Sequence, residues 1–248
     1  MRFLLGLAGL LCFGVLLELV PTRYTPATSE ILSNLAGQLT SSVFWRATLD
    51  TLGTWLLGLV IAIAAGVVVG VLIGSVPLLR AATASTIEFL RPIPSVALIP
   101  LVVVLYGSTV SATLVLVVYA AFWQVLIQVL AGVADIDPVA SDTARSYHLG
   151  RWARIRYLVW PTALPYVVTG VRLAATVALI LTITGELVIG SPGLGQEIAN
   201  ARVSGAVPAM YALIVVTGIF GVAANLLTRA AERKALAWHP SMRTEVPA

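Results

Sequence analysis

Apolar residues recur along this chain in six runs long enough to be candidates for membrane-spanning helices. About 20 consecutive apolar residues cross a hydrocarbon core of about 30 Å. The runs cover residues 3–20, 52–75, 93–107, 110–131, 163–189 and 208–228. No segment alternates polar and apolar residues as a half-buried strand would. The pattern predicts an all-α membrane protein with six transmembrane helices, in which residues 1–248 form a single domain.

Composition supports the membrane class and excludes several others. Of 248 residues, 59% are hydrophobic and 10% are charged, against roughly 25% charged in soluble domains. The mean hydropathy is +0.98. The net charge is +4. Because basic residues of a membrane protein gather on its cytoplasmic side, this charge indicates topology, and no nucleic-acid partner is expected. One cysteine, Cys12, excludes an internal disulfide, and neither His148 nor His239 has zinc-like neighbours, so no metal site is expected.

The first run has two interpretations. Met1 and Arg2 followed by apolar residues fit a signal peptide. However, no small-residue cleavage site closes the run, and Glu18 stands where one would be expected. We therefore expect a retained first span.

Basic residues orient the predicted spans. If both termini are cytoplasmic, most basic residues fall on the cytoplasmic side and few fall outside, as the positive-inside rule requires. The cytoplasmic set is Arg2, Arg80, Arg91, Arg145, Arg151, Arg154, Arg156, Arg229, Arg233, Lys234 and Arg243, and the outer set is Arg23, Arg46 and Arg202. Residues 132–162 then form the longest cytoplasmic loop.

Several residues within the spans are candidates for the pathway or its gate. Pro94 and Pro100 interrupt a short span, which either lines a pathway or is a kinked packing helix. Gln124 and Gln128 share a helical face and either join helices by hydrogen bonds or contact a solute. Gly66, Gly70 and Gly74 predict instead a face for close helix packing.

Two charged residues lie in the fifth span. Arg172 either lines the inner pathway or pairs with a carboxylate or carbonyl that holds the helices together. Glu186 precedes the turn Ser191–Gly195 and is expected to serve packing or gating rather than solute contact. That turn predicts an outer re-entrant loop.

The long loop predicts two short helices. Asp137 is an N-cap with Pro138 at the first helical position, and the helix runs to about Leu149, with Gly150 ending it. A second helix runs from Arg151 to Pro161, with Trp152, Ile155 and Val159 on one stripe. Such an ordered protrusion is typical of a docking surface for a cytoplasmic partner. The alternative is a basic loop lying on the membrane.

This loop resembles the conserved cytoplasmic loop of permease subunits of binding-protein-dependent ABC importers. The family pattern is Glu-Ala-Ala, three residues, Gly, nine residues, Ile, one residue, Leu-Pro. Its positions here are Asp142-Thr143-Ala144, His148, Leu158 and Trp160-Pro161. The spacing matches, whereas Asp142, Thr143, His148 and Trp160 depart in type. His148 stands at the family's turn glycine, and Gly150 is the candidate to replace it.

Two further segments and the flanks of the loop extend the resemblance over about residues 45–238. "EFLRPIPSVALIPLVVVLYG" (88–107), "ARSYHLGRWARIRYLVWPTALPYVVTGVRLA" (144–174) and "GELVIGSPGLGQEI" (185–198) are similar to the branch that handles nitrate, alkyl sulfonates, taurine and thiamine precursors. The resemblance implies a type I importer permease of the bacterial inner membrane that imports such a small solute.

The resemblance also implies partners. Two permeases form the pathway as a homodimer in the bilayer, a periplasmic or lipid-anchored binding protein delivers the solute, and a cytoplasmic ATPase holds ATP and Mg²⁺. This chain has no phosphate-binding loop, so it is expected to be a transporter subunit without a cofactor and not an enzyme. The implied ATPase-coupling residues are Asp142, Thr143, Ala144, Arg145, Ser146, Tyr147, His148, Leu149, Gly150, Leu158 and Pro161. For Arg145 the alternative is an ion pair with Asp142.

Two other classes of protein compete with this interpretation. Membrane enzymes that transfer phospho-alcohol groups hold metal with clustered aspartates, but after Asp142 this chain has no aspartate to complete a metal cage. A stand-alone secondary carrier would show inverted repeats and more intramembrane ionisable residues. It is retained as the alternative function.

Overall fold

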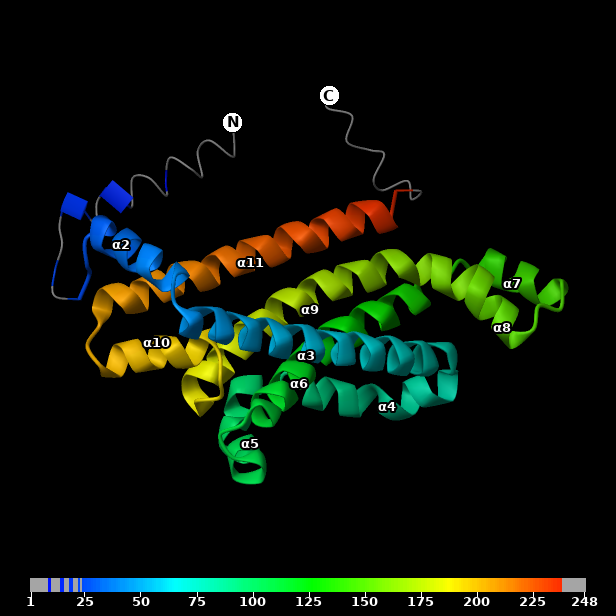
Figure 1. Cartoon of the computed structure of the whole chain (residues 1–248). Helices are drawn as coiled ribbons and strands as arrows, with labels where there is room; N and C mark the ends of the chain where they lie inside the picture. The colour runs from blue at the N-terminus through cyan, green and yellow to red at the C-terminus, as the bar shows by residue number, and fades with distance from the viewer. Residues whose placement is uncertain (1–8, 10–13, 16–17, 20–21, 23, 238–248) are drawn as a thin grey trace.

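The computed structural model describes residues 9, 14–15, 18–19, 22 and 24–237, and Figure 1 shows that this part of the chain is helical. Most of the predicted first span, 3–20, lies outside the described residues. The elements are α2 (Thr28–Leu39), α3 (Ser42–Ser75), α4 (Pro77–Leu90), η1 (Ser95–Leu98), α5 (Ile99–Tyr106), α6 (Val110–Ala134), α7 (Pro138–Ser146), α8 (Arg151–Arg154), η2 (Ile155–Val159), α9 (Trp160–Ile189), α10 (Leu194–Val203) and α11 (Val207–Ala235).

Four helices in the described part are long and apolar enough to cross a membrane. They are Ser42–Ser75, Val110–Ala134, Trp152–Ile189 and Val207–Ala235. A fifth crossing arises only if α4 and the segment Ser95–Tyr106 count as one span bent by 81°. The described residues therefore hold up to five of the six expected crossings.

Helices α3 and α6 pack closely along the predicted glycine face. A Cβ atom built at Gly66 would lie 2.7 Å from Val125 Cβ, and one at Gly70 would lie 2.7 Å from Val129 Cγ1. Gly74 meets Val133 in the same way. The valines recur every four residues as the glycines do, so each fills the space that a missing side chain leaves. The predicted packing face is confirmed.

The α4–α5 segment is broken where the sequence places its prolines. Pro94 is the N-cap of η1, and Pro100 lies in the first turn of α5. The sequence predicts no span between residues 76 and 92, where the structure has helix α4. The Tyr119 hydroxyl of α6 donates to the Leu90 carbonyl at 2.8 Å, so a side chain satisfies one carbonyl at the end of α4.

One helix continues from the cytoplasmic loop into the span that follows. The prediction that the loop's second helix ends at Pro161 is wrong, because α8, η2 and α9 follow without a break. η2 is a π-helical turn in which the Trp160 N–H donates to the Ile155 carbonyl. Pro161 has no N–H to donate, and the wider turn just before it accommodates that loss.

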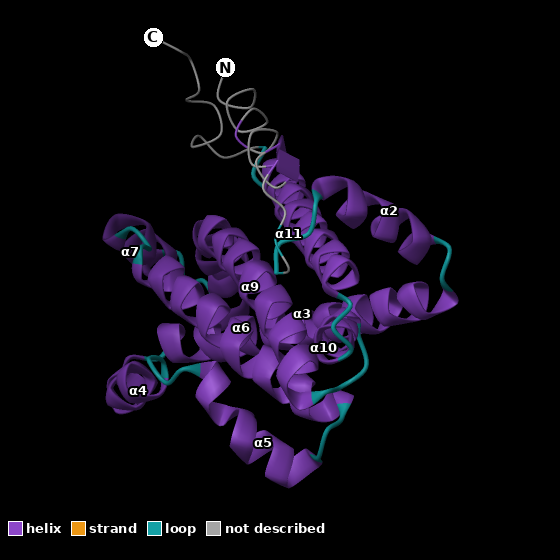
Figure 2. Cartoon of the chain, turned by 90° about the vertical axis from the view of Figure 1, so that its left-hand side faces the viewer, coloured by secondary structure: helices purple, strands orange, loops and turns teal. Residues whose placement is uncertain are grey.

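The two ends of the bundle differ. Helices α2 and α10 lie at one end, and α7 and α8 project from the other, while α3, α6, α9 and α11 run between them (Figure 1). Seen along the bundle, α4 and α5 lie on the side opposite α2 (Figure 2). The loop and the turn Ser191–Gly195 are thus joined by α9 but sit at opposite ends.

Candidate functional site

The predicted docking turn, residues 142–150, includes the end of helix α7, which begins with the expected N-cap. The Asp137 carboxylate accepts a hydrogen bond from the Val139 N–H at 2.7 Å, and Pro138 occupies the first turn of α7. An N-cap of this kind fixes where a short helix starts. This part of the prediction is confirmed.

The end of α7 differs from the prediction. The helix stops at Ser146 rather than near Leu149, and it closes with two bonds, from the His148 N–H to the Arg145 carbonyl (2.9 Å) and from the Leu149 N–H to the Ala144 carbonyl (3.0 Å). This pattern is a Schellman motif, which requires a left-handed residue after the C-cap.

His148 is that left-handed residue. Its φ is +51°, the one positive φ outside glycine among the described residues. The suggestion that Gly150 takes over the role of the family glycine is therefore wrong, since Gly150 is not among the residues with positive φ. The turn keeps the backbone shape that the spacing implies, although a residue with a side chain occupies it.

The turn exposes aromatic side chains. Tyr147 is 79% and Trp152 is 82% exposed, while Ala144 beneath them is 4% exposed. The prediction that Trp152, Ile155 and Val159 share one face is wrong, because Val159 is buried and Trp152 is exposed. Passing from α8 into the π-helical turn changes the period, so the three positions no longer share one face.

Polar contacts brace the protrusion. Arg154 on α8 donates to the Ser141 hydroxyl of α7 at 3.3 Å. Tyr166 on α9 donates to Asp135 at 2.8 Å, which ties the end of α6 to α9. Arg145 and Asp142 form the alternative ion pair, at 3.2 Å, but both side chains are exposed, so it stabilises little.

The eleven predicted coupling residues fall into two groups. Residues 142–150 come together in the turn, whereas Leu158 and Pro161 are half-buried where η2 passes into α9. The second pair therefore lies away from the turn, where the protrusion joins the bundle.

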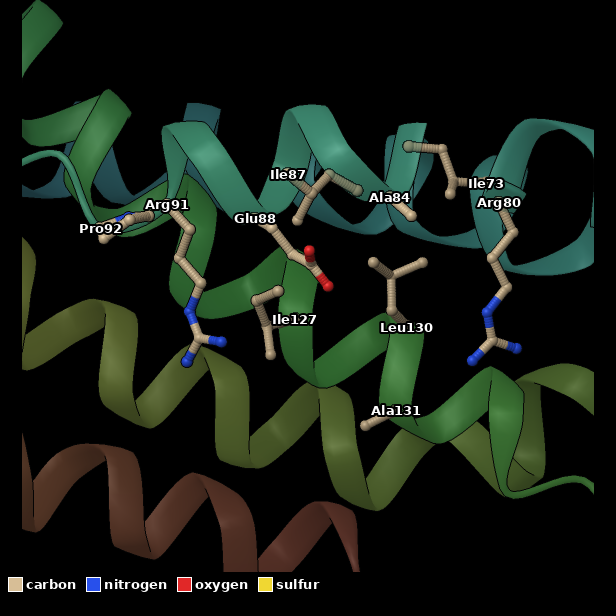
Figure 3. Close-up of a pocket in the computed structure, with 10 residues that line it drawn as sticks. All are labelled: Ile73, Arg80, Ala84, Ile87, Glu88, Arg91, Pro92, Ile127, Leu130 and Ala131. Carbon is tan, nitrogen blue, oxygen red and sulfur yellow. The ribbon is translucent and has the colours of Figure 1, made fainter. Parts of the chain in front are cut away.

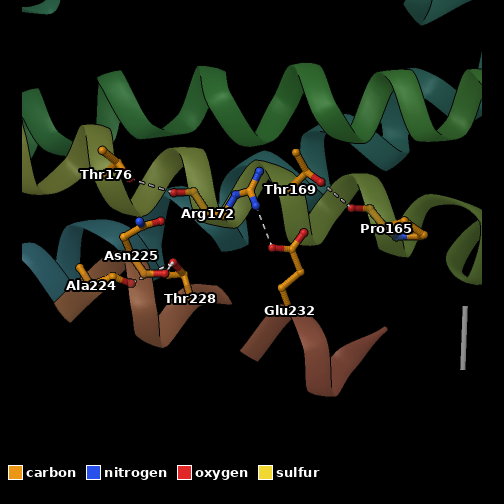
Figure 4. A network of polar contacts seen from close by, with 8 residues as sticks. All are labelled: Pro165, Thr169, Arg172, Thr176, Ala224, Asn225, Thr228 and Glu232. Carbon is orange, nitrogen blue, oxygen red and sulfur yellow. Dashed lines mark hydrogen bonds and ion pairs between the residues drawn. The ribbon is translucent and has the colours of Figure 1, made fainter. Parts of the chain in front are cut away.

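Arg172 has a partner within the chain. Its Nη1 lies 3.0 Å from Oε2 of Glu232 on α11 (Figure 4). The Arg172 side chain is 36% exposed and that of Glu232 is 17% exposed. Of the two roles considered for Arg172, this geometry favours holding α9 against α11.

Glu186 lies at the centre of a buried polar cluster near the other end of α9. The side chain is fully buried, and its Oε2 accepts from the Thr51 hydroxyl and from the Gly195 N–H, each at 2.9 Å. Gly193 has φ +151°, and a Cβ there would overlap the Glu186 carboxyl. The carboxyl thus holds the turn before α10, as a packing or gate role requires.

The other pathway candidates occupy different surroundings. Gln124 and Gln128 are half-buried on α6, where Gln128 packs against Gly170 of α9. No hydrogen bond from either amide occurs within the described part of the chain. Pro94 and Pro100 are exposed beside the bend between α4 and α5.

Sequence reasoning missed two sets of residues. Thr51 gave no signal, because its partner lies 135 residues away. Glu88 on α4 and Arg91 at its C-cap line a groove together with Arg80 (Figure 3). Here a signal existed, since three ionisable residues at positions 80, 88 and 91 fall on one side of a helix.

The described helices form an apolar bundle, long enough to cross a membrane, with one braced protrusion at its end. Comparison with known proteins agrees. The family model described as "Binding-protein-dependent transport system inner membrane component" matches residues 62–236. The chain therefore belongs to this family.

Two named relatives support this membership. The taurine transport system permease protein TauC of Escherichia coli (strain K12) is 28% identical over 228 residues, 90% of this chain and 83% of the relative. The nitrate import permease protein NrtB of Leptolyngbya laminosa is 26% identical over 227 residues, 90% of this chain and 81% of the relative.

A solved structure of the inward-facing MetNI methionine ABC transporter matches with a TM-score of 0.67, 19% identity and coverage of 78% of this chain and 96% of that chain. The fold is therefore that of a type I ABC importer permease. The chain is a multi-pass permease subunit of an ABC importer in the inner membrane and not itself an enzyme.

Proposed function

We propose that residues 142–150 dock on a separate cytoplasmic ATPase and that α9 transmits the movement of this turn to the solute pathway. The observation that carries this proposal is the exposed aromatic surface of an otherwise braced protrusion. Tyr147, Trp152 and Tyr157 are 79%, 82% and 69% exposed. Large exposed aromatic groups on an ordered projection are typical of a protein-binding surface.

The internal order of the turn favours a protein partner over a membrane surface. A basic loop lying on lipid headgroups needs charge but no fixed shape. Helix α7 has an N-cap at Asp137 and a complete Schellman motif at His148, and a hydrogen bond from Arg154 to Ser141 fixes α8 against it. Ordering these groups costs conformational entropy, which a specific docking contact offsets.

Continuity of the helix supports transmission. From Trp152 to Ile189 the chain forms one helical rod of 38 residues, about 57 Å long at 1.5 Å per residue. One end of the rod adjoins the docking turn, and the other carries Glu186 beneath the turn that precedes α10. A tilt imposed at the docking turn therefore moves the buried cluster at the far end.

The remaining partners follow from this assignment. ATP and Mg²⁺ belong to the ATPase, two copies of the chain form the pathway, and a periplasmic or lipid-anchored binding protein delivers the solute at the end that carries α2 and α10. Both termini are then cytoplasmic. The taurine and nitrate relatives support a small solute such as taurine, an alkyl sulfonate, nitrate or a thiamine-precursor-like compound.

Recovery of the tagged protein from its native host in mild detergent, followed by mass spectrometry, tests the proposal. We expect an ATPase near one-to-one with the chain. Scrambling residues 142–150 should remove the ATPase without preventing membrane insertion, whereas scrambling residues 28–36 of α2, at the opposite end, should not. A chain that is recovered alone in its wild-type form would contradict the coupling role and favour a secondary carrier.

A further inference from the structure

Helix α4 presents three ionisable side chains to one groove. The groove lies between α3, α4 and α6 and has a volume of about 580 Å³. Arg80 and Glu88 line it from α4, Arg91 lines it from the C-cap of that helix, and Ile127 and Leu130 line it from α6. In Figure 3 the two guanidinium groups and the carboxylate all extend from α4 toward the α6 side of the groove.

The groove lies beside the middle of a span. Leu90, next to Arg91, accepts a hydrogen bond from Tyr119, which is near the middle of the 25-residue helix α6. An ionisable group at such a depth is costly against lipid and faces water or a solute. The assignment of Arg91 to the cytoplasmic side is therefore wrong, since it lies level with the middle of α6. Arg91 and Glu88 mark a water-filled space at that depth.

Glu88 and Arg91 are neighbours that do not pair. Residues at i and i+3 of a helix have Cβ atoms about 5–6 Å apart, within easy reach of an ion pair. In the described part of the chain the ion pairs are Arg145–Asp142 and Arg172–Glu232, and neither lies in this groove. A carboxylate and a guanidinium thus face the same space with room between them.

We propose that Arg91 and Glu88 bind the transported solute and select a small zwitterion, with its oxyanion against Arg91 and its ammonium against Glu88. This rests on the proposed function as a solute pathway. A simple anion is attracted by Arg91 but repelled by Glu88, whereas a zwitterion satisfies both. Ile127 and Leu130 supply apolar contact for a short carbon chain.

Arg80 belongs to the same groove but to a different position in it. It lies about 16 Å from Arg91 along α4 at 1.5 Å per residue. One small solute cannot contact both guanidinium groups. Arg80 therefore serves as a matched control of the same chemistry on the same helix.

A zwitterionic lipid headgroup carries the same chemistry as such a solute. Phosphatidylethanolamine presents a phosphate and an ammonium, so it is a second source of the ligand. The two sources are separated by comparing nanodiscs of phosphatidylglycerol, whose headgroup has no ammonium, with nanodiscs that also contain phosphatidylethanolamine.

The test is equilibrium binding of radiolabelled taurine to the purified permease–ATPase complex in phosphatidylglycerol nanodiscs, without binding protein. Isethionate, which replaces the ammonium of taurine by a hydroxyl, is the competitor. Taurine should bind about tenfold more tightly than isethionate. Glu88→Gln should abolish this preference, and Arg91→Gln should weaken both ligands about tenfold. Arg80→Gln should change neither by more than about twofold.

Three results would overturn the inference. Equal binding of isethionate and taurine to the wild-type complex would remove the role of Glu88. A loss with Arg80→Gln as large as that with Arg91→Gln would place the solute elsewhere. Phosphatidylethanolamine that displaces taurine, and that is retained by the wild type but not by Arg91→Gln, would assign the groove to lipid. Because the ATPase is present in the same preparation, each result is distinct from failure of the importer function.

Discussion

The Thr51 hydroxyl on α3 donates to Oε2 of Glu186 on α9 at 2.9 Å and accepts from the Leu194 N–H at 2.8 Å. A single hydroxyl therefore joins two helices to the start of α10. Oε2 also accepts from Gly195, whereas Oε1 has no hydrogen-bond partner among the described residues. Buried polar groups held in this way are strongly coupled.

Glu186→Ala should destabilise the protein by ~2–4 kcal/mol, because it leaves the Thr51 hydroxyl and the Gly195 N–H without their acceptor. Glu186→Gln should recover most of that loss, since its amide oxygen can still accept. Thermal unfolding in detergent measures both. Glu197→Gln, a half-buried acid on α10, is the control and should leave the midpoint nearly unchanged. Equal midpoints for Glu186→Ala and Glu197→Gln would contradict the assigned role.

Gly66→Ala should destabilise the α3–α6 contact by ~1–3 kcal/mol through overpacking. The added Cβ would lie 2.7 Å from Val125 Cβ and 3.3 Å from the Leu126 backbone nitrogen, so the helices must separate. Gly53→Ala on the same helix meets nothing within 4 Å and should be neutral or slightly stabilising. The difference between the two unfolding midpoints is the measurement, and no difference would refute the close packing.

His148→Gly should preserve the docking turn and raise its stability by up to about 1 kcal/mol, because glycine adopts the left-handed conformation without steric cost. His148→Val should open the turn, since β-branched residues disfavour positive φ. Hydrogen exchange of the His148-position and Leu149 amides, which bond to Arg145 and Ala144, reports the result directly.

Gly150→Ala provides the comparison for the His148 variants. Gly150 is not among the residues with positive φ, and nothing lies within 4 Å of an added Cβ. Its exchange pattern should match the wild type. Faster exchange in Gly150→Ala than in His148→Val would show that the left-handed residue had been assigned wrongly.

The Arg172–Glu232 pair should show a coupling free energy of about 1–2 kcal/mol in a double-mutant cycle. Each single replacement by alanine strands a partly buried charge. The exposed Asp142–Arg145 pair, with side chains 72% and 68% exposed, should give a coupling of at most about 0.5 kcal/mol. Thermal unfolding of the wild type, the two single variants and the double variant of each pair measures the coupling free energy. Similar couplings for the two pairs would argue against a structural role for Arg172.

Local signals predicted local structure well. Asp137 followed by Pro138 predicted the start of α7 to the residue, because an N-cap depends only on its neighbours. The glycine spacing from Gly66 to Gly74 predicted a packing face, since helical periodicity fixes which residues share a side. Both features are encoded within a few turns of chain.

Other features depend on contacts that a sequence does not display. Thr51 meets Glu186 only after α3 and α9 pack, and Arg172 meets Glu232 across 60 residues. Helix α4 was missed because "PLLRAATAST" is too polar to form an apolar run. Pro161 was expected to end a helix, but the preceding π-helical turn absorbs the missing donor.

ATP-driven uptake of radiolabelled taurine into proteoliposomes, measured with the chain, its binding protein and the co-purified ATPase, tests the coupling of transport to ATP hydrolysis most directly. Uptake should require both ATP and the ATPase, and Tyr147→Glu at the exposed docking turn should abolish it while leaving insertion intact. Tyr24 is similarly exposed but distant in sequence from the turn, so the Tyr24→Glu variant should still bind the ATPase. Uptake by the chain alone, driven by an ion gradient and indifferent to Tyr147→Glu, would contradict the account and identify a secondary carrier.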